Sequence, residues 1–336
     1  MANGIEALRR IQIGAEATHG TLVTTTTFLR GLGVPADETE HIFPAENIGI
    51  VPGTDRSYVA QKIGTLAYSA PLTFEQLHPF QAGLYTAAAS ADGAGTGQIW
   101  EYVLPTTTVK SASDLTSYTM QAGDNNAAEE IAFCFVPDFT IAGSYGEAMT
   151  LDANWRGMSW EASTFDALGA SDLMSVTEII FNKGKLYIDD ATGTIGTTLV
   201  SNTLLNMSLK VTTRWRAQPA ADGTLTFSLI KQVMPEAELT LTFEHNTSAA
   251  TEKAAWRAKT PRLIKLLFEG DALTSAGTTY TYKTFAIEAA GKYSTFAALE
   301  SDAGNDTIQA TFKIRYNTTA AKYLQFTFVN ENATMP

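Results

Sequence analysis

Four histidines and a single cysteine are the residues that could bind a metal or serve as base and nucleophile. They are His19, His41, His78, His245 and Cys134. No two histidines stand four residues apart, and the chain has no Cys-x-x-Cys pair and no Gly-x-Ser-x-Gly elbow. One cysteine supports neither an internal disulfide nor a zinc site with two or more thiolates. We therefore expect no metal site and no catalytic nucleophile.

Two pairs of adjacent carboxylates and a glycine-rich stretch are the other candidates for chemistry. Glu129–Glu130 and Asp189–Asp190 are direct neighbours, and neighbours on a strand point to opposite faces, which rules out a shared acid–base role. Gly93, Gly95 and Gly97 are spaced like a phosphate loop, but no lysine follows them as such a loop requires. These patterns predict no cofactor and no enzyme.

Tryptophan side chains could instead stack on a sugar or a base. The five are Trp100, Trp155, Trp160, Trp215 and Trp256. Trp155 and Trp256 stand in patterns typical of a core, and a core or a subunit interface is the favoured interpretation for most of them. A carbohydrate-binding β-sandwich module remains an alternative, and it would need exposed aromatic residues beside acids.

Composition limits the classes of function. The chain has 336 residues, 45% of them hydrophobic and only 17% charged, and its net charge is −12. An acidic chain is a poor candidate for gripping nucleic acid, because phosphate binding requires clustered lysine and arginine. The polar N-terminus predicts no signal peptide, and no apolar run is long enough to cross a membrane.

One short stretch occurs twice and organises the chain. Leu72–Glu75 reads Leu-Thr-Phe-Glu, and Leu241–Glu244 repeats it about half a chain length later. Each copy closes a strand-like run and precedes a helix-like segment. An alternating strand ends each half, Met149–Arg156 in the first and Lys322–Asn330 in the second. We interpret the chain as a tandem duplication of one β-rich unit.

In the first half, Pro52, Gly53, Thr54 and Asp55 form a turn by composition. We expect this turn to be the tip of a long hairpin. The expected arms are Glu46–Val51 and Tyr58–Ser69, and an extended N-terminal arm with short strands precedes them. A helix is predicted over Glu75–Ala88, and a strand with both faces apolar over Ile131–Val136.

In the second half, apolar and polar residues alternate more regularly. The predicted strands are Leu205–Thr212, Leu225–Leu229, Leu239–Phe243, Leu263–Phe268, Ile308–Tyr316 and Leu324–Phe328. The turn-rich stretch that holds Gln218, Asp222 and Gly223 is the expected second hairpin tip. A helix is predicted over Ser248–Ala258, with Ser248 as its N-cap.

These elements predict an all-β fold with one short helix in each repeat. The order of hairpin, helix and further strands argues against a βαβ repeat and favours antiparallel sheets in a sandwich or partial barrel. We place the first domain, with its N-terminal arm, at residues 1–160 and the second at 161–336.

Several stretches of the chain resemble the major tail tube protein of long-tailed phages. They are Tyr118–Asp124, Glu129–Glu130, Phe139–Gly143, Gly146–Ala148, Leu151–Gly157, Leu239–Leu266 and Leu324–Asn330. From the first to the last, they span most of the chain. The family fold is a β-sandwich flanked by a helix, with a long hairpin that extends from it, and this order agrees with the elements predicted in both halves.

The resemblance implies a structural virion protein that is assembled in the bacterial host cytoplasm and located in the tail. Rings would stack into a tube through which DNA and the tape measure protein pass without specific binding. Tail tip and terminator proteins would be further partners. With two units in each chain, three chains would make a pseudo-hexameric ring, closed as a β-barrel. A hexamer with the second half outside the tube is the rival arrangement.

Three further expectations follow from the ring. The two hairpin tips are candidates for contacts between stacked rings. An acidic tube wall would repel phosphates and let DNA slide. The nearest alternative functions are those of a tail terminator, which would form single rings, and a capsid decoration protein.

Overall fold

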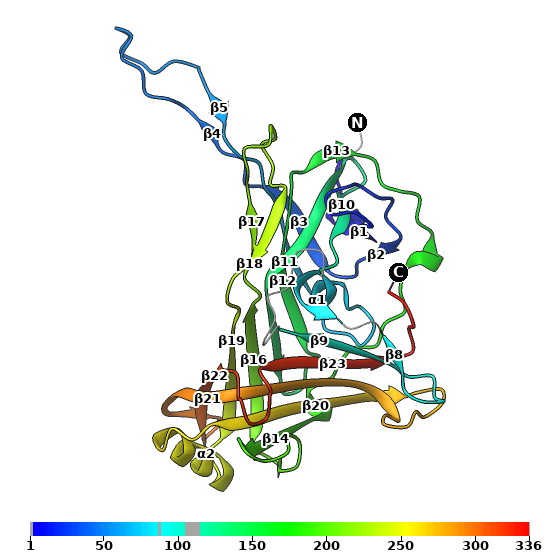
Figure 1. The fold of residues 1–336 in the computed structure, drawn as a ribbon, viewed down its shortest axis with the longest axis vertical. Coiled ribbons are helices and arrows are strands. Elements are labelled where there is room, and N and C mark those ends of the chain that lie inside the picture. The colour runs from blue at the N-terminus through cyan, green and yellow to red at the C-terminus, as the bar shows by residue number, and fades with distance from the viewer. Residues whose placement is uncertain (1–2, 87–88, 105–114, 336) are drawn as a thin grey trace.

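Antiparallel β-sheet dominates the computed structural model of the chain (Figure 1). The structure describes residues 3–86, 89–104 and 115–335. Strands make up 50% of the structure and helical segments 8%, so the predicted all-β class is confirmed. The single chain does not close a barrel.

The elements of the first half lie between residues 6 and 163. They are the 3₁₀ helix η1 (Glu6–Leu8), β1 (Arg10–Ala15), β2 (Thr27–Phe28), β3 (Leu32–Asp37), β4 (His41–Ile42), β5 (Tyr58–Val59), β6 (Gly64–Pro71), α1 (His78–Gly83), β7 (Tyr85–Thr86), β8 (Ser90–Ala91), β9 (Gln98–Val103), β10 (Tyr118–Gly123), β11 (Ala128–Ser144), β12 (Thr150–Gly157) and β13 (Glu161–Ser163).

The elements of the second half follow after a short connection. They are the 3₁₀ helices η3 (Ala170–Asp172) and η4 (Phe181–Lys183), then β14 (Gly184–Asp190), β15 (Leu199–Val200), β16 (Leu204–Thr212), β17 (Trp215–Gln218), β18 (Leu229–Gln232), β19 (Glu236–Glu244), α2 (Thr247–Arg257), β20 (Arg262–Ala272), β21 (Tyr282–Asp302), β22 (Asn305–Ile314) and β23 (Leu324–Asn330).

The same order of strand pairings occurs in both halves. In the first, β6 pairs with β3 and β12, while β11 pairs with β10, β12 and β13. In the second, β19 pairs with β16 and β22, while β21 pairs with β20, β22 and β23. The pairs β1–β2 and β1–β10 have counterparts in β14–β15 and β14–β20. Each strand of one set therefore has a counterpart in the other.

The counterpart of β12 differs from the sequence-based expectation. Met149–Arg156 was matched with Lys322–Asn330, but β12 occupies the place of β22, and β23 occupies the place of β13. The two strand sequences alternate alike, and alternation does not reveal which neighbour a strand takes. The pairing pattern nevertheless repeats.

Two layers are connected by the long strands β11 and β21, whose two ends pair with different neighbours. Eight strands form a continuous first layer in the order β3–β6–β12–β11–β16–β19–β22–β21. In this layer buried residues such as Leu151, Leu209 and Leu241 alternate with polar ones. The layer therefore has one core face and one polar face.

Strands β7 to β9 have no counterpart in the second half. They follow α1, and β9 pairs with the outer edge of β23. One hydrophobic core extends through both halves and includes Trp155, Phe139, Phe285 and Phe328. The units on either side of the expected boundary at residue 160 thus share a sheet and a core, and β13 begins just after that boundary.

Three predicted elements of the first half differ in the structure. The hairpin strands pair as β3–β6 and β4–β5, so Glu46–Val51 is part of the loop at the hairpin end. The N-terminal arm has the expected short strands, but β1 is part of the sheet, because it pairs with β10. Helix α1 ends at Gly83, where a Cβ atom would lie 3.0 Å from the Val136 carbonyl oxygen; residues 87–88 of the predicted helix lie outside the described residues.

In the second half, the helix and one strand are displaced. Asn246, rather than Ser248, caps α2, because its side chain accepts a hydrogen bond from the Ala249 N–H at 3.1 Å. The hairpin strand after the second tip is β18, which begins where the predicted strand Leu225–Leu229 ends. The predicted double burial of Ile131–Val136 is confirmed, since all six residues are buried.

Candidate assembly surfaces

Within the first layer the two halves join at one strand pair. Residues Asp138–Ser144 of β11 pair antiparallel with Asn206–Thr212 of β16. Ile141 lies opposite Leu209 in this pair, and both side chains are buried. The Thr213 N–H donates to the Pro137 carbonyl oxygen at 2.9 Å and extends the pairing by one step. The chain therefore contains one example of how a first unit joins a second.

The β17–β18 hairpin of the second half also packs on the first half. Trp215 donates its indole N–H to the Gly83 carbonyl oxygen at 3.2 Å. The Phe227 ring lies 5.2 Å from that of Phe133 and 5.9 Å from that of Phe135. A second buried cluster is formed by Trp215, Phe227, Phe133 and Phe135 together with Tyr85, Leu115 and Ile230. The junction thus combines strand pairing with a docked hairpin.

Strand β3 is an open edge of the first layer. It pairs with β6, and within the described residues no strand pairs with its other side. Leu32 and Val34 are 78% and 52% exposed. Glu38 donates its N–H to Ile63, so by alternation the backbone groups of Gly33 and Pro35 point away from β6. Pro35 has no backbone N–H to donate at this edge, and proline in sheets is found mainly on edge strands.

The C-terminal part of β21 is the other open edge of this layer. Beyond Gly291 it pairs with β22 alone among the described strands. Leu299, in this part, is 47% exposed. By the repeated pairing order, β21 is the counterpart of β11, and β3 is the counterpart of β16. The two open edges are therefore the counterparts of the two strands that join inside the chain.

The polar face of the first layer has ordered rows of side chains. The register places Asp152, Thr140, Lys210, Glu238 and Lys313 side by side across five strands. A parallel row contains Asn154, Asp138, Thr212 and Glu236, and another row has only neutral residues, namely Thr150, Ala142, Ser208, Thr240 and Thr311. Carboxylates and lysines are thus interspersed.

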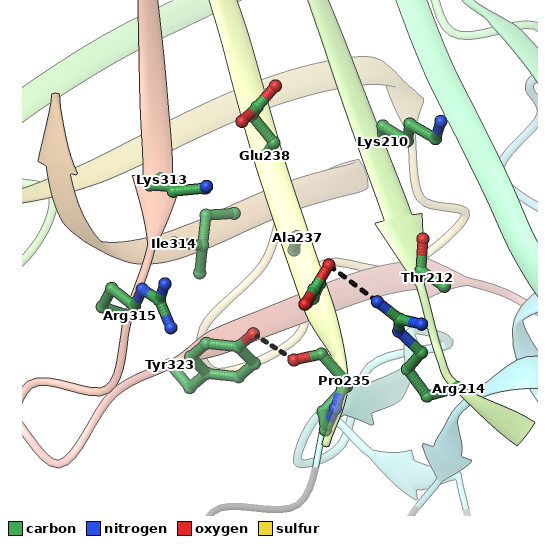
Figure 2. A pocket seen from close by; sticks show the side chains of 11 residues that line it. Lys210, Thr212, Arg214, Pro235, Ala237, Glu238, Lys313, Ile314, Arg315 and Tyr323 are labelled. Atoms are coloured by element: carbon green, nitrogen blue, oxygen red, sulfur yellow. Dashed lines mark hydrogen bonds and ion pairs between the residues drawn. The ribbon is translucent and has the colours of Figure 1, made fainter. Parts of the chain in front are cut away.

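A hollow of about 420 Å³ lies on this face (Figure 2). Arg214 and Glu236 form an ion pair of 2.9 Å at its rim, and the Tyr323 hydroxyl donates to the Pro235 carbonyl oxygen at 3.2 Å. Lys313 and Arg315 project from the β22 side, and no described carboxylate lies within 4.0 Å of either. This part of the face therefore carries cations as well as carboxylates.

The first expected tip lies at the far end of the projecting hairpin. Pro52, Gly53, Thr54 and Asp55 fall in the loop between β4 and β5, outside the main body (Figure 1). A Cβ atom on Gly53 would meet nothing within 4 Å, and the Thr54 hydroxyl donates to the Glu46 carboxylate at 3.0 Å. The tip is therefore free to contact another molecule.

The second expected tip is near the base of the first hairpin. Gln218 ends β17 opposite Leu229, and Asp222 accepts two hydrogen bonds from Thr224 in the turn, where Gly223 has φ +89°. Lys62 donates its N–H to the Leu225 carbonyl oxygen at 2.9 Å. The structure thus ties the second hairpin to the base of the first and does not bring the two tips together.

The candidates for chemistry are dispersed or buried. His19 Nδ1 lies 2.6 Å from the Ser117 hydroxyl, which donates to Glu16 at 2.6 Å, but Ser117 is fully buried. Burial raises the pKa of the Cys134 thiol well above its usual range. Within the described ranges no three His, Cys, Asp or Glu side chains are grouped to hold a metal ion. The absence of enzymatic activity stays a prediction.

Asp189 and Asp190 serve separate structural roles. Asp189 accepts hydrogen bonds from the N–H groups of Gly196 and Thr198, while Asp190 forms an ion pair with Arg262. Sequence reasoning did not identify the two open edges, since an edge is defined by missing partners.

No protein-family model matches the sequence, and no curated protein matches it at a significant level. Among the helices in the described part of the chain, none has the length and apolarity to span a membrane.

Proposed function

We propose that this chain is a phage tail tube protein whose rings stack into the conduit for DNA and the tape measure protein. One observation carries the proposal. The chain joins its own two units through β11 and β16, and it leaves the counterparts of these strands, β21 and β3, open. The same junction can therefore be repeated between chains.

If each unit is rotated by about one sixth of a circle relative to the unit before it, the six units of three chains close into a ring. The β21 edge of one chain would pair with the β3 edge of the next, as β11 pairs with β16 inside each chain. Heterologous contacts that close form rings. Eight first-layer strands from each of three chains would give a barrel of twenty-four strands, and barrels of roughly 16 or more strands leave an aqueous channel.

The physical drive for closure is the removal of open edges. Unpaired edges promote uncontrolled association, and closing a barrel removes them. Pairing would also supply partners for the backbone groups of Gly33 and Pro35 that point away from β6. The virion tail is the proposed location, and the terminator and tail tip proteins are the proposed end partners.

The polar face of the layer would line the channel, because the opposite face is the core. Its central rows hold Asp138, Asp152, Glu236 and Glu238 beside two lysines. Interspersed charge of both signs offers no continuous cationic track for the phosphates of DNA. Such a wall favours sliding over binding.

The internal junction favours three chains over six. In a hexamer with the second half outside, the two units would occupy different environments. Here they share one continuous layer and one core. A tail terminator would use the same ring without stacking, so the length of the assemblies separates these two functions.

Electron microscopy of the purified protein, with and without a tail tip complex and the tape measure protein, tests the proposal. Tubes of stacked rings are the expected result. Single rings that never stack would favour a terminator. A monomer that stays dispersed with both initiators present would contradict the tube function and lead back to the carbohydrate-binding alternative.

A further inference from the structure

The two hairpins of the chain differ in their surroundings. The second, with Trp215, Phe227 and Ile230, is buried on the first half. The outer part of the first, residues 40–60, projects from the body (Figure 1). Phe43 and Tyr58 on it are 67% and 52% exposed. The first hairpin thus carries aromatic side chains that lack the cover given to the second.

The seat of the second hairpin is built from three places in the first unit. Leu115 precedes β10, Phe133 and Phe135 belong to β11, and Met158 follows β12. A bulge in β11 aims these rings at the hairpin: Phe133 has φ 58°, and its N–H donates to Glu16 at 2.7 Å. The seat is therefore a defined feature of the unit.

The corresponding three places of the second unit line a hollow of about 300 Å³. Pro261 precedes β20, residues 291–294 belong to β21, and Tyr316 follows β22. The second buried cluster fills the seat on the first unit, whereas this hollow is open. The hollow lies beside the open edge of β21. The seat of the β17–β18 hairpin lies in the same way beside the β11–β16 junction.

We propose that this hollow receives residues 40–60, the first hairpin, of a neighbouring copy of the chain. The inference rests on the proposed ring and specifies its second contact. When β3 of one chain pairs with β21 of the next, the hairpin that follows β3 reaches the hollow, as the hairpin that follows β16 reaches its own seat.

Charge supports this occupant. The hollow is lined by Lys292, Lys313 and Arg315 and by no carboxylate. The projecting hairpin carries Glu40, Glu46 and Asp55 against Arg56. Complementary charge at an interface fixes register and excludes wrong partners. A second copy of this chain therefore fits the hollow in both apolar and charged character.

Disulfide mapping on the assembled full-length protein tests the contact. Two single variants, Tyr58→Cys and Tyr316→Cys, are purified separately, mixed, assembled and oxidised. Covalent dimers are expected in the mixture and in neither variant alone, and the double variant should give covalent closed trimers. Tyr145→Cys replaces Tyr316→Cys in the matched control, since Tyr145 is also exposed but lies outside the hollow.

Removal of the aromatic side chains supplies a second readout. Phe43→Ser with Tyr58→Ser should leave the monomer folded and raise the concentration needed for assembly at least about tenfold, as for aromatic anchors at interfaces. The control pair Leu199→Ser with Leu229→Ser changes two exposed apolar residues outside the hairpin and the hollow and should leave ring formation unchanged.

The outcomes separate the two proposals. Normal tubes with cross-linking no higher than the Tyr145→Cys control would overturn the hairpin contact and leave the tube function standing. Failure of the unmodified protein to assemble under any initiating condition would contradict both.

Discussion

Ile141 of β11 lies directly opposite Leu209 of β16, and this pair joins the first unit of the chain to the second. Both side chains are fully buried. The pairing order on either side of this point is the same, so the junction is a template for contacts between chains. The proposed ring of three chains depends on that template.

The open β3 edge should be essential for assembly but not for folding. We expect Leu32→Asp with Val34→Asp to abolish rings, because each carboxylate would stand beside the proposed junction in a row that already holds Asp152 or Asp138, and aspartate disfavours strand pairing. Since both residues are exposed, the free energy of unfolding should change by no more than about 0.5 kcal/mol for each. Size-exclusion chromatography and urea unfolding measure the two effects. Leu229→Asp, at another exposed strand position, is the control; rings formed by the double variant would argue against this edge.

Trp215 should hold the second hairpin on the first unit. Its side chain is buried, and its ring lies 5.7 Å from that of Tyr85. We expect Trp215→Ala to lower the free energy of unfolding by about 3–5 kcal/mol, because it leaves a cavity and removes an indole hydrogen bond. Urea unfolding measures the change. A loss below about 1 kcal/mol would mean that the hairpin docks without this residue.

Glu288 should make stability depend on pH. Burial raises its pKa, but ion pairs with Lys322 at 2.6 Å and Lys265 at 3.0 Å more than offset this, and the pKa lies below its ordinary 4.5. The charged form is therefore favoured by folding. This stabilisation is complete above the unfolded pKa and is lost as the pH falls through the folded pKa.

The variant Glu288→Gln tests this dependence. At pH 7 we expect the free energy of unfolding to fall by about 2 kcal/mol, and the difference from the unmodified protein to shrink at acidic pH. Urea unfolding of both proteins at pH 7 and at an acidic pH measures the two differences. Glu269→Gln is the control, because Glu269 pairs with Lys185 near the surface and should contribute about 0.5 kcal/mol. Equal differences for Glu288→Gln at both pH values would refute the assignment.

Charge on the polar face should control the passage of DNA. We expect Asp138→Lys with Asp152→Lys to leave tubes intact and to reduce infectivity about tenfold or more, because added cations bind phosphate. Plaque counts and electron microscopy of phage with the variant tails measure both effects. Asp271→Lys, at the end of β20, is the control. Unchanged infectivity in the double variant would remove this face from the channel.

Local features of the fold could be predicted from sequence. Strict alternation identified β16, β19 and β22, because one buried and one polar face require period two. Partners could not be predicted, since β9 pairs with β23 across most of the chain. The bulge at Phe133 could not be predicted either, because it depends on a hydrogen bond to Glu16 from a distant segment.

The candidate surfaces were predictable only in part. Turn composition located the tips at Pro52–Asp55 and near Gly223, since turns are encoded locally. The open edges of β3 and β21 arise from the pairing pattern of the whole sheet. Their exposed apolar residues, such as Val34, look in sequence like any other strand residue.

The most direct test of the central claim is a cryo-electron microscopy map of the assembled protein, in which chains and units are counted around one ring. We predict six similar units from three chains, with β21 of each chain paired to β3 of the next and a polar face lining the channel. A ring of six chains with twelve units, or a ring in which β3 and β21 remain unpaired, would contradict the account.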